Sequence, residues 1–74
     1  MGKEEQKMID YLVICVNEFA DRVGMSYKDT FNYLNKYMAI KFIKENYEIE
    51  HTLSLDDAIE DMMIVASNNG GHIK

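Results

Sequence analysis

The chain has 74 residues, enough for one small domain but too few for two domains or a doubly wound sheet. Its 47% hydrophobic and 28% charged residues are typical of a globular protein, and the single cysteine excludes a disulfide within the chain. The net charge of −5 argues against phosphate-backbone binding as the main function, and the absence of proline favours helices.

The start of the chain is polar and acidic, unlike the basic and then apolar start of a signal peptide. The longest uninterrupted apolar run is residues 11–16, far shorter than the roughly 20 residues of a membrane span. We therefore expect a cytoplasmic protein that does not bind membranes. Cys15 lies inside this apolar run, so we expect a reduced and buried thiol.

The first predicted helix covers residues 4–23, where apolar side chains recur with helical periodicity. On a helical wheel they occupy an arc of roughly 200°, wider than one ordinary surface stripe. They are Met8, Ile9, Tyr11, Leu12, Val13, Cys15, Val16, Phe19, Ala20 and Val23. The width indicates either a central helix or half of an oligomer interface. Gly24 is the expected C-terminal stop.

Two further helices are predicted over residues 27–36 and 37–47. Ser26 is the expected N-cap of the first, with Asp29 three residues later in a capping box. No glycine or proline separates the two segments, so the pattern also allows one bent helix. Residues 48–53 are β-branched or polar and are expected to be extended or irregular.

The last predicted helix covers residues 55–68, with Ser54 as its N-cap and Asp57 three residues later. The Asn-Gly-Gly sequence at 69–71 ends it. We therefore predict an all-α fold: a single helical domain over 1–74, built as a small four-helix bundle with a central N-terminal helix. Its ordered core covers about 4–69, and residues 70–74 form a frayed tail.

Charge is distributed unevenly along the chain. Residues 26–44 contain four lysines and one aspartate, whereas residues 45–61 contain seven carboxylates and no lysine or arginine. The acidic cluster at the start of the last helix comprises Asp56, Asp57, Glu60 and Asp61. It is interpreted either as a solvated face favoured by the helix dipole or as a site for a basic partner, with Asp57 and Asp61 as candidates. It lacks the alternating ligands and central glycine of a calcium loop.

His51 is the one histidine outside the predicted tail. A zinc site needs three or four ligands, and a catalytic histidine needs a nucleophile or acid partner, neither of which the sequence provides. We expect His51 to close a loop by hydrogen bonding to a backbone group or carboxylate, with a binding role as the alternative. No catalytic, metal-binding or cofactor-binding residue is predicted, and no cofactor or small-molecule ligand.

Two isoleucines fall outside the predicted core stripes. Ile14 lies on the polar side of the first helix, and Ile64 lies on the polar side of the last. Single exposed apolar residues are ordinary, but together with the wide arc they indicate a surface for a protein partner or for self-association. The alternative is a small helix-turn-helix-like DNA-binding regulator that uses the lysines of residues 26–44, although nucleic acid is not the expected partner.

The order of these features resembles a small bacterial family known as a domain of unknown function, number 3791, over about residues 7–66. The most specific shared element is Tyr47-x-x-x-His51-Thr52, to which we assign a structural role. The family often has glycine before the third helix, where this chain has Tyr37 and Met38. Some members are encoded beside ADP-ribosyltransferase-like proteins, so the resemblance implies an accessory or antitoxin-like regulator of a neighbouring enzyme. The leading hypothesis is a non-enzymatic protein-interaction module.

Overall fold

A computed structural model describes residues 2–72 and confirms an all-α protein, with no strand in that range. The helices are α1 (Lys3–Val23), α2 (Tyr27–Lys36), α3 (Ala39–Glu45), α4 (Tyr47–Glu50) and α5 (Leu55–Asn68). Over these residues there are five helices where four were expected, because the segment after α3 is helical rather than extended. The predicted frayed tail also includes residues 73–74, which lie outside the described residues.

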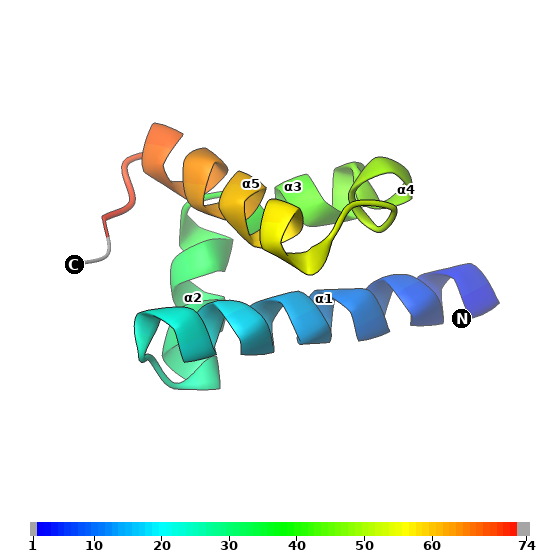
Figure 1. The fold of residues 1–74 in the computed structure, drawn as a ribbon, viewed down its shortest axis with the longest axis horizontal. Helices are drawn as coiled ribbons and strands as arrows, with labels where there is room; N and C mark the ends of the chain where they lie inside the picture. The colour runs from blue at the N-terminus through cyan, green and yellow to red at the C-terminus, as the bar shows by residue number, and fades with distance from the viewer. Residues whose placement is uncertain (1, 73–74) are drawn as a thin grey trace.

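The helices form two layers (Figure 1). Helix α1 runs along one side, α3, α4 and α5 lie over it, and α2 crosses between the layers. We expected the N-terminal helix at the centre of the fold, whereas α1 forms one outer side of this arrangement. The short helix α3 contacts all four other helices, and Ala39, Ile40 and Ile43 on it are buried.

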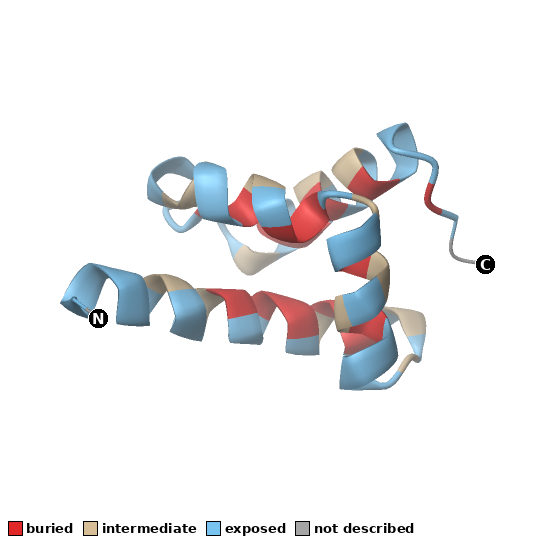
Figure 2. Ribbon diagram, turned by 180° about the vertical axis from the view of Figure 1, so that it is seen from behind, coloured by how far each residue is buried: buried red, intermediate tan, exposed pale blue. Residues whose placement is uncertain are grey.

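The core lies between the two layers, where the buried residues of each helix face one another (Figure 2). Helix α1 contributes Leu12, Cys15, Val16, Phe19 and Ala20, which form the middle of its wide apolar arc. Cys15 is buried, as the apolar run around it predicts. The edge of the arc is less covered, because Ile9 and Val13 remain 36% and 39% exposed.

Helix ends follow the signals in the sequence. Gly24 adopts a left-handed conformation at φ 71° and donates its backbone N–H to Ala20, which ends α1. The Ser26 hydroxyl accepts the backbone N–H of Asp29 at 3.1 Å, and the Ser54 hydroxyl accepts that of Asp57 at 3.1 Å. Both predicted N-caps are therefore confirmed.

Helices α2 and α3 are two separate helices, which answers the question left open by the sequence. The break is at Met38, which has a left-handed backbone with φ 72° and precedes α3. This conformation redirects the chain so that Ala39 and Ile40 enter the core against α5. Met38 is the only described residue other than glycine with a positive φ.

Helix α4 covers the first part of residues 48–53, which we expected to be extended or irregular, and residues 51–53 form a turn. Asn46 ends α3, where its side-chain amide and its backbone N–H both donate to the Phe42 carbonyl at 3.0 Å. The chain then makes one further helical turn, in which the Glu50 N–H donates to the Asn46 carbonyl at 2.8 Å. Local hydrogen bonds outweigh the weak strand preference of this sequence.

The first residues of the expected tail are packed. The Gly71 N–H donates to the Ala66 carbonyl at 2.8 Å, and Gly71 is buried beside Tyr33. A Cβ atom at Gly71 would lie 2.6 Å from the Tyr33 hydroxyl, so this contact requires glycine. The sequence did not predict this contact, because the approach to Tyr33 depends on α2 and cannot be read from the local sequence.

Candidate functional site

The Tyr47-x-x-x-His51-Thr52 element forms α4 and the turn that follows it. The Nδ1 atom of His51 is 2.7 Å from the Tyr47 carbonyl oxygen, which can only accept, so Nδ1 carries the proton. The imidazole also stacks on the Tyr47 ring, with 4.6 Å between centroids. The Thr52 hydroxyl donates to the Ile49 carbonyl at 2.6 Å. Through these local contacts, Tyr47, His51 and Thr52 all help to close the turn.

A buried carboxyl group lies under this turn, and our sequence reasoning missed it. Glu50 is only 4% exposed, and its Oε1 atom has no hydrogen-bond partner among the described residues. Burial, followed by a hydrogen bond and charge repulsion from Asp61, raises the pKa of Glu50 to about 7. The raised pKa means that the folded protein favours the protonated form of Glu50 more than the unfolded chain does.

Helix α1 contributes an aromatic hydroxyl and a thiol to the same place. The Tyr11 hydroxyl donates to the Glu50 backbone carbonyl at 3.0 Å, and the Tyr11 ring meets the Tyr47 ring edge-on at 5.6 Å. Burial raises the pKa of the Tyr11 phenol and also that of the Cys15 thiol. A thiol with a raised pKa is a poor nucleophile at neutral pH, so this cluster is suited to fixing α4 on α1.

Helical periodicity is the signal that would have found Glu50. If residues 47–51 are placed on a helix, Tyr47, Glu50 and His51 share one face at spacings of three and four residues. The expectation ended the third helix at Tyr47 and placed Glu50 in an extended or irregular segment, so the two residues were not put on one helix. The partner Asp61 was singled out from sequence as part of the acidic cluster, and the structure brings it to Glu50.

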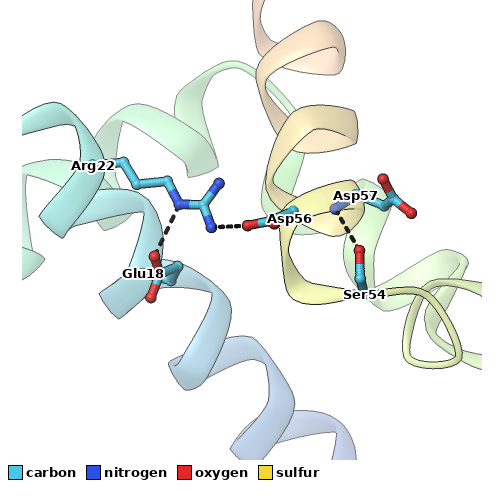
Figure 3. A network of polar contacts seen from close by, with 5 residues as sticks. All are labelled: Glu18, Arg22, Ser54, Asp56 and Asp57. Carbon is cyan, nitrogen blue, oxygen red and sulfur yellow. Dashed lines mark hydrogen bonds and ion pairs between the residues drawn. The ribbon is translucent and has the colours of Figure 1, made fainter.

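The rest of the acidic cluster lies at the start of α5 (Figure 3). Arg22 at the end of α1 pairs with Glu18 at 2.9 Å and with Asp56 across the helix interface. The hydrogen bonds that Arg22 donates to Glu18 and then to Asp56 raise the pKa of its guanidinium. Asp57 is exposed, and only its backbone N–H takes part in the Ser54 cap. Asp57 and Asp61 therefore lie in different environments, one exposed and one half-buried.

Ile14 and Ile64 are exposed, as their positions on the helical wheel predict. Ile14 is 54% exposed on α1, and Ile64 is 50% exposed on α5. A further aliphatic side chain, Ile49 on α4, is 65% exposed, the largest value among the large apolar residues described. This residue was not identified from the sequence, because its segment was expected to be irregular.

An open groove of about 500 Å³ lies where the first turns of α1 meet the junction between α3 and α4. Met8, Tyr47 and Ile49 supply its apolar surface.

Among the described residues, no group of three or more His, Cys, Asp or Glu side chains is arranged to bind a metal ion. No helix in the described range has the length and apolar character needed to cross a bilayer.

Comparison with known proteins gives one match. A family model described as "Protein of unknown function (DUF3791)" matches residues 10–69, which include every helix except the first turns of α1. No curated protein and no solved structure matches the chain.

Proposed function

The chain belongs to the DUF3791 family, whose function is unknown, and from its own surface we propose that it is a non-enzymatic protein-interaction module. The observation that carries this proposal is the exposure of Ile14 and Ile64 on the polar faces of the two longest helices. Each leaves about half of its aliphatic surface in water, and a protein partner would bury that surface.

The partner is a second protein, or a second copy of this chain. The resemblance stated above makes a neighbouring enzyme the first candidate, with this chain as its accessory or antitoxin-like regulator. Burial raises the pKa of the Cys15 thiol, which makes this group a poor nucleophile and supports a binding role rather than catalysis through it. A cytoplasmic location is part of the same proposal.

The DNA-binding alternative has less support. The lysines of residues 26–44 are exposed on α2 and α3, but Lys36 lies over the Tyr37 ring at 5.3 Å and Lys44 borders the acidic groove. The alternative stays a prediction. Duplex DNA would be retained at low salt and released steeply as salt rises.

The proposal is tested with the Ile14→Lys/Ile64→Lys double variant. Tagged wild-type protein is used to capture partners from the native cell lysate, the eluate is identified by mass spectrometry, and its mass is measured by light scattering. We expect the wild type to hold a stoichiometric partner or to self-associate, and the double variant to lose it, because each lysine places a charge in the buried apolar contact.

A matched control is the Asn32→Lys/Asn35→Lys variant, which adds the same two charges on exposed positions of α2. It is expected to keep the partner. A strictly monomeric wild type at high concentration, combined with a double variant that retains every captured protein, would exclude the proposal. Circular dichroism confirms that each variant is folded.

A further inference from the structure

We propose that the groove between the start of α1 and the α3–α4 junction binds a basic amphipathic segment of a partner protein. This inference rests on the proposed function, because it specifies the chemistry of the partner. The occupant we infer has an apolar anchor flanked by lysine or arginine, presented by another protein.

The groove has a continuous apolar surface contributed by two segments far apart in the sequence. Met8 comes from α1, and Tyr47 and Ile49 come from α4. The Tyr47 ring is held edge-on against Tyr11 and stacked on His51, so this wall is rigid. Ile49 is 65% exposed and has the most surface to gain from being covered. A volume of about 500 Å³ falls within the usual range of about 300–1,000 Å³ for binding pockets.

The rim of the groove is acidic. Glu4 and Glu5 approach from α1, and Glu45 and Glu48 approach from the other side, against the single positive charge of Lys44. All four carboxylates belong to exposed residues, and none of them forms an ion pair with another described residue. Charge complementarity therefore selects a positively charged occupant, and it rejects an acidic one.

The first turns of α1 extend beyond α4 and have little packing of their own (Figures 1 and 2). Residues 3–7 are all exposed. Helical turns without tertiary contacts are marginal in water, so a segment lying in the groove would stabilise this end of α1 as it binds. An amphipathic helix would suit the geometry, because anchors three or four residues apart lie on one face while the intervening basic residues reach the rim.

A second copy of this chain is a poorer occupant. Each copy carries a net charge of −5, so two copies repel one another over their whole surfaces. The carboxylate rim would require a concentrated basic patch on that copy, whereas the lysines of α2 and α3 are spread over two helices. A positively charged partner would not be repelled, and it could present a concentrated basic patch to the rim.

The test begins with a displayed library of random peptides of about 16 residues, selected on immobilised wild-type protein. The most enriched peptide is then synthesised with a fluorophore and titrated by anisotropy. We expect enriched sequences with lysine or arginine around an aliphatic or aromatic anchor. Their affinity is expected to fall as salt rises from about 50 to about 300 mM.

Three variants locate the binding site. Glu48→Lys reverses one charge of the rim, and Ile49→Ser removes exposed apolar surface, so each should weaken the peptide about tenfold or more. Glu60→Lys is the matched control, because it makes the same charge change on exposed α5 outside the groove. It should change the affinity by less than about twofold.

The proposal is overturned if no peptide is enriched, if the enriched peptides are neutral or acidic, or if Glu60→Lys weakens binding as much as Glu48→Lys. Self-association of the wild type that Glu48→Lys abolishes would assign the groove to a second copy instead. The proposed function is judged separately, by Ile14→Lys/Ile64→Lys. Partner loss in that variant, without any effect of Glu48→Lys or Ile49→Ser, would leave the interaction module standing and remove the groove from it.

Discussion

Met38 has the least favourable backbone conformation of any described residue other than glycine. Its φ of 72° places the Cβ atom close to the following carbonyl, which costs roughly 1–2 kcal/mol for an L-residue. Met38 is 39% exposed, so the burial of the rest of its surface offsets only part of that cost. The resemblance to a family that often has glycine before the third helix agrees with this geometry, because glycine adopts the conformation without strain.

Replacing Met38 by glycine is therefore expected to stabilise the protein. Relief of about 1–2 kcal/mol of strain exceeds the entropic cost of glycine, about 0.5–1 kcal/mol, and leaves a net gain of up to about 1 kcal/mol. Urea denaturation measures the change in the free energy of unfolding. The control, Met38→Ala, keeps the strained φ and should give no gain. If both variants lose the same stability, side-chain packing rather than backbone strain dominates at this position.

At the scale of elements, helix α5 has two kinds of polar contact at its first turn. The Ser54 hydroxyl caps the helix through the Asp57 N–H, and Asp56 reaches Arg22 at the end of α1 (Figure 3). The ion pair is exposed to solvent and contributes little. The cap satisfies a helix N–H that otherwise has no partner within the helix, and it is the stronger local contribution.

Ser54→Ala is expected to lower the free energy of unfolding by about 1 kcal/mol, because the Asp57 N–H loses its acceptor. The matched control is Ser67→Ala on the exposed surface of the same helix, where alanine has the better helix propensity and stability should be unchanged or slightly higher. Thermal unfolding followed by circular dichroism compares the two. Equal losses in both variants would contradict a specific role for the cap.

At the scale of the whole molecule, Glu50 lies where three helices meet. Its carboxyl faces Asp61 and, at longer range, Asp57 of α5, and it lies near Tyr11 and Cys15 of α1. Charging this group would leave it buried and opposed by other carboxylates, which is why the folded protein holds its proton. Protonation of this one residue is therefore linked to the stability of the fold.

Stability should fall as the pH rises between about 4.5 and about 7. In this window the folded protein keeps a proton that unfolded Glu50 has already lost, so folding weakens as pH increases, by up to about 3 kcal/mol. Below the window both states are protonated and this contribution is complete. Denaturant titrations at about pH 5 and about pH 8 measure the difference in the free energy of unfolding.

Glu50→Gln removes the titrating group while keeping its shape, so it should flatten this pH dependence. Glu48→Gln, an exposed neighbour on the same helix, should leave the dependence as in the wild type. A steep loss of stability that survives in Glu50→Gln would show that another group is responsible.

Comparison of particular residues shows why only part of the candidate site was accessible from sequence. The exposure of Ile14 and Ile64 follows from helical periodicity, which compares residues within one helix. The groove could not be predicted, because it brings together Met8 and Ile49, which are 41 positions apart in the sequence, and requires the fold of α4. Glu50 was missed for the same reason, since its burial depends on α1 and α5.

The sequence by itself determined the all-α class, the two serine caps, the Gly24 stop and the burial of Cys15. Each of these depends on residues within one or two helical turns, where hydrogen-bonding and periodicity rules apply directly. The tertiary structure alone decided the left-handed Met38, the packed Gly71 and the buried Glu50 with its raised pKa. These depend on contacts between segments distant in the chain, because burial and electrostatic environment are set by whichever helices pack together rather than by neighbours in sequence.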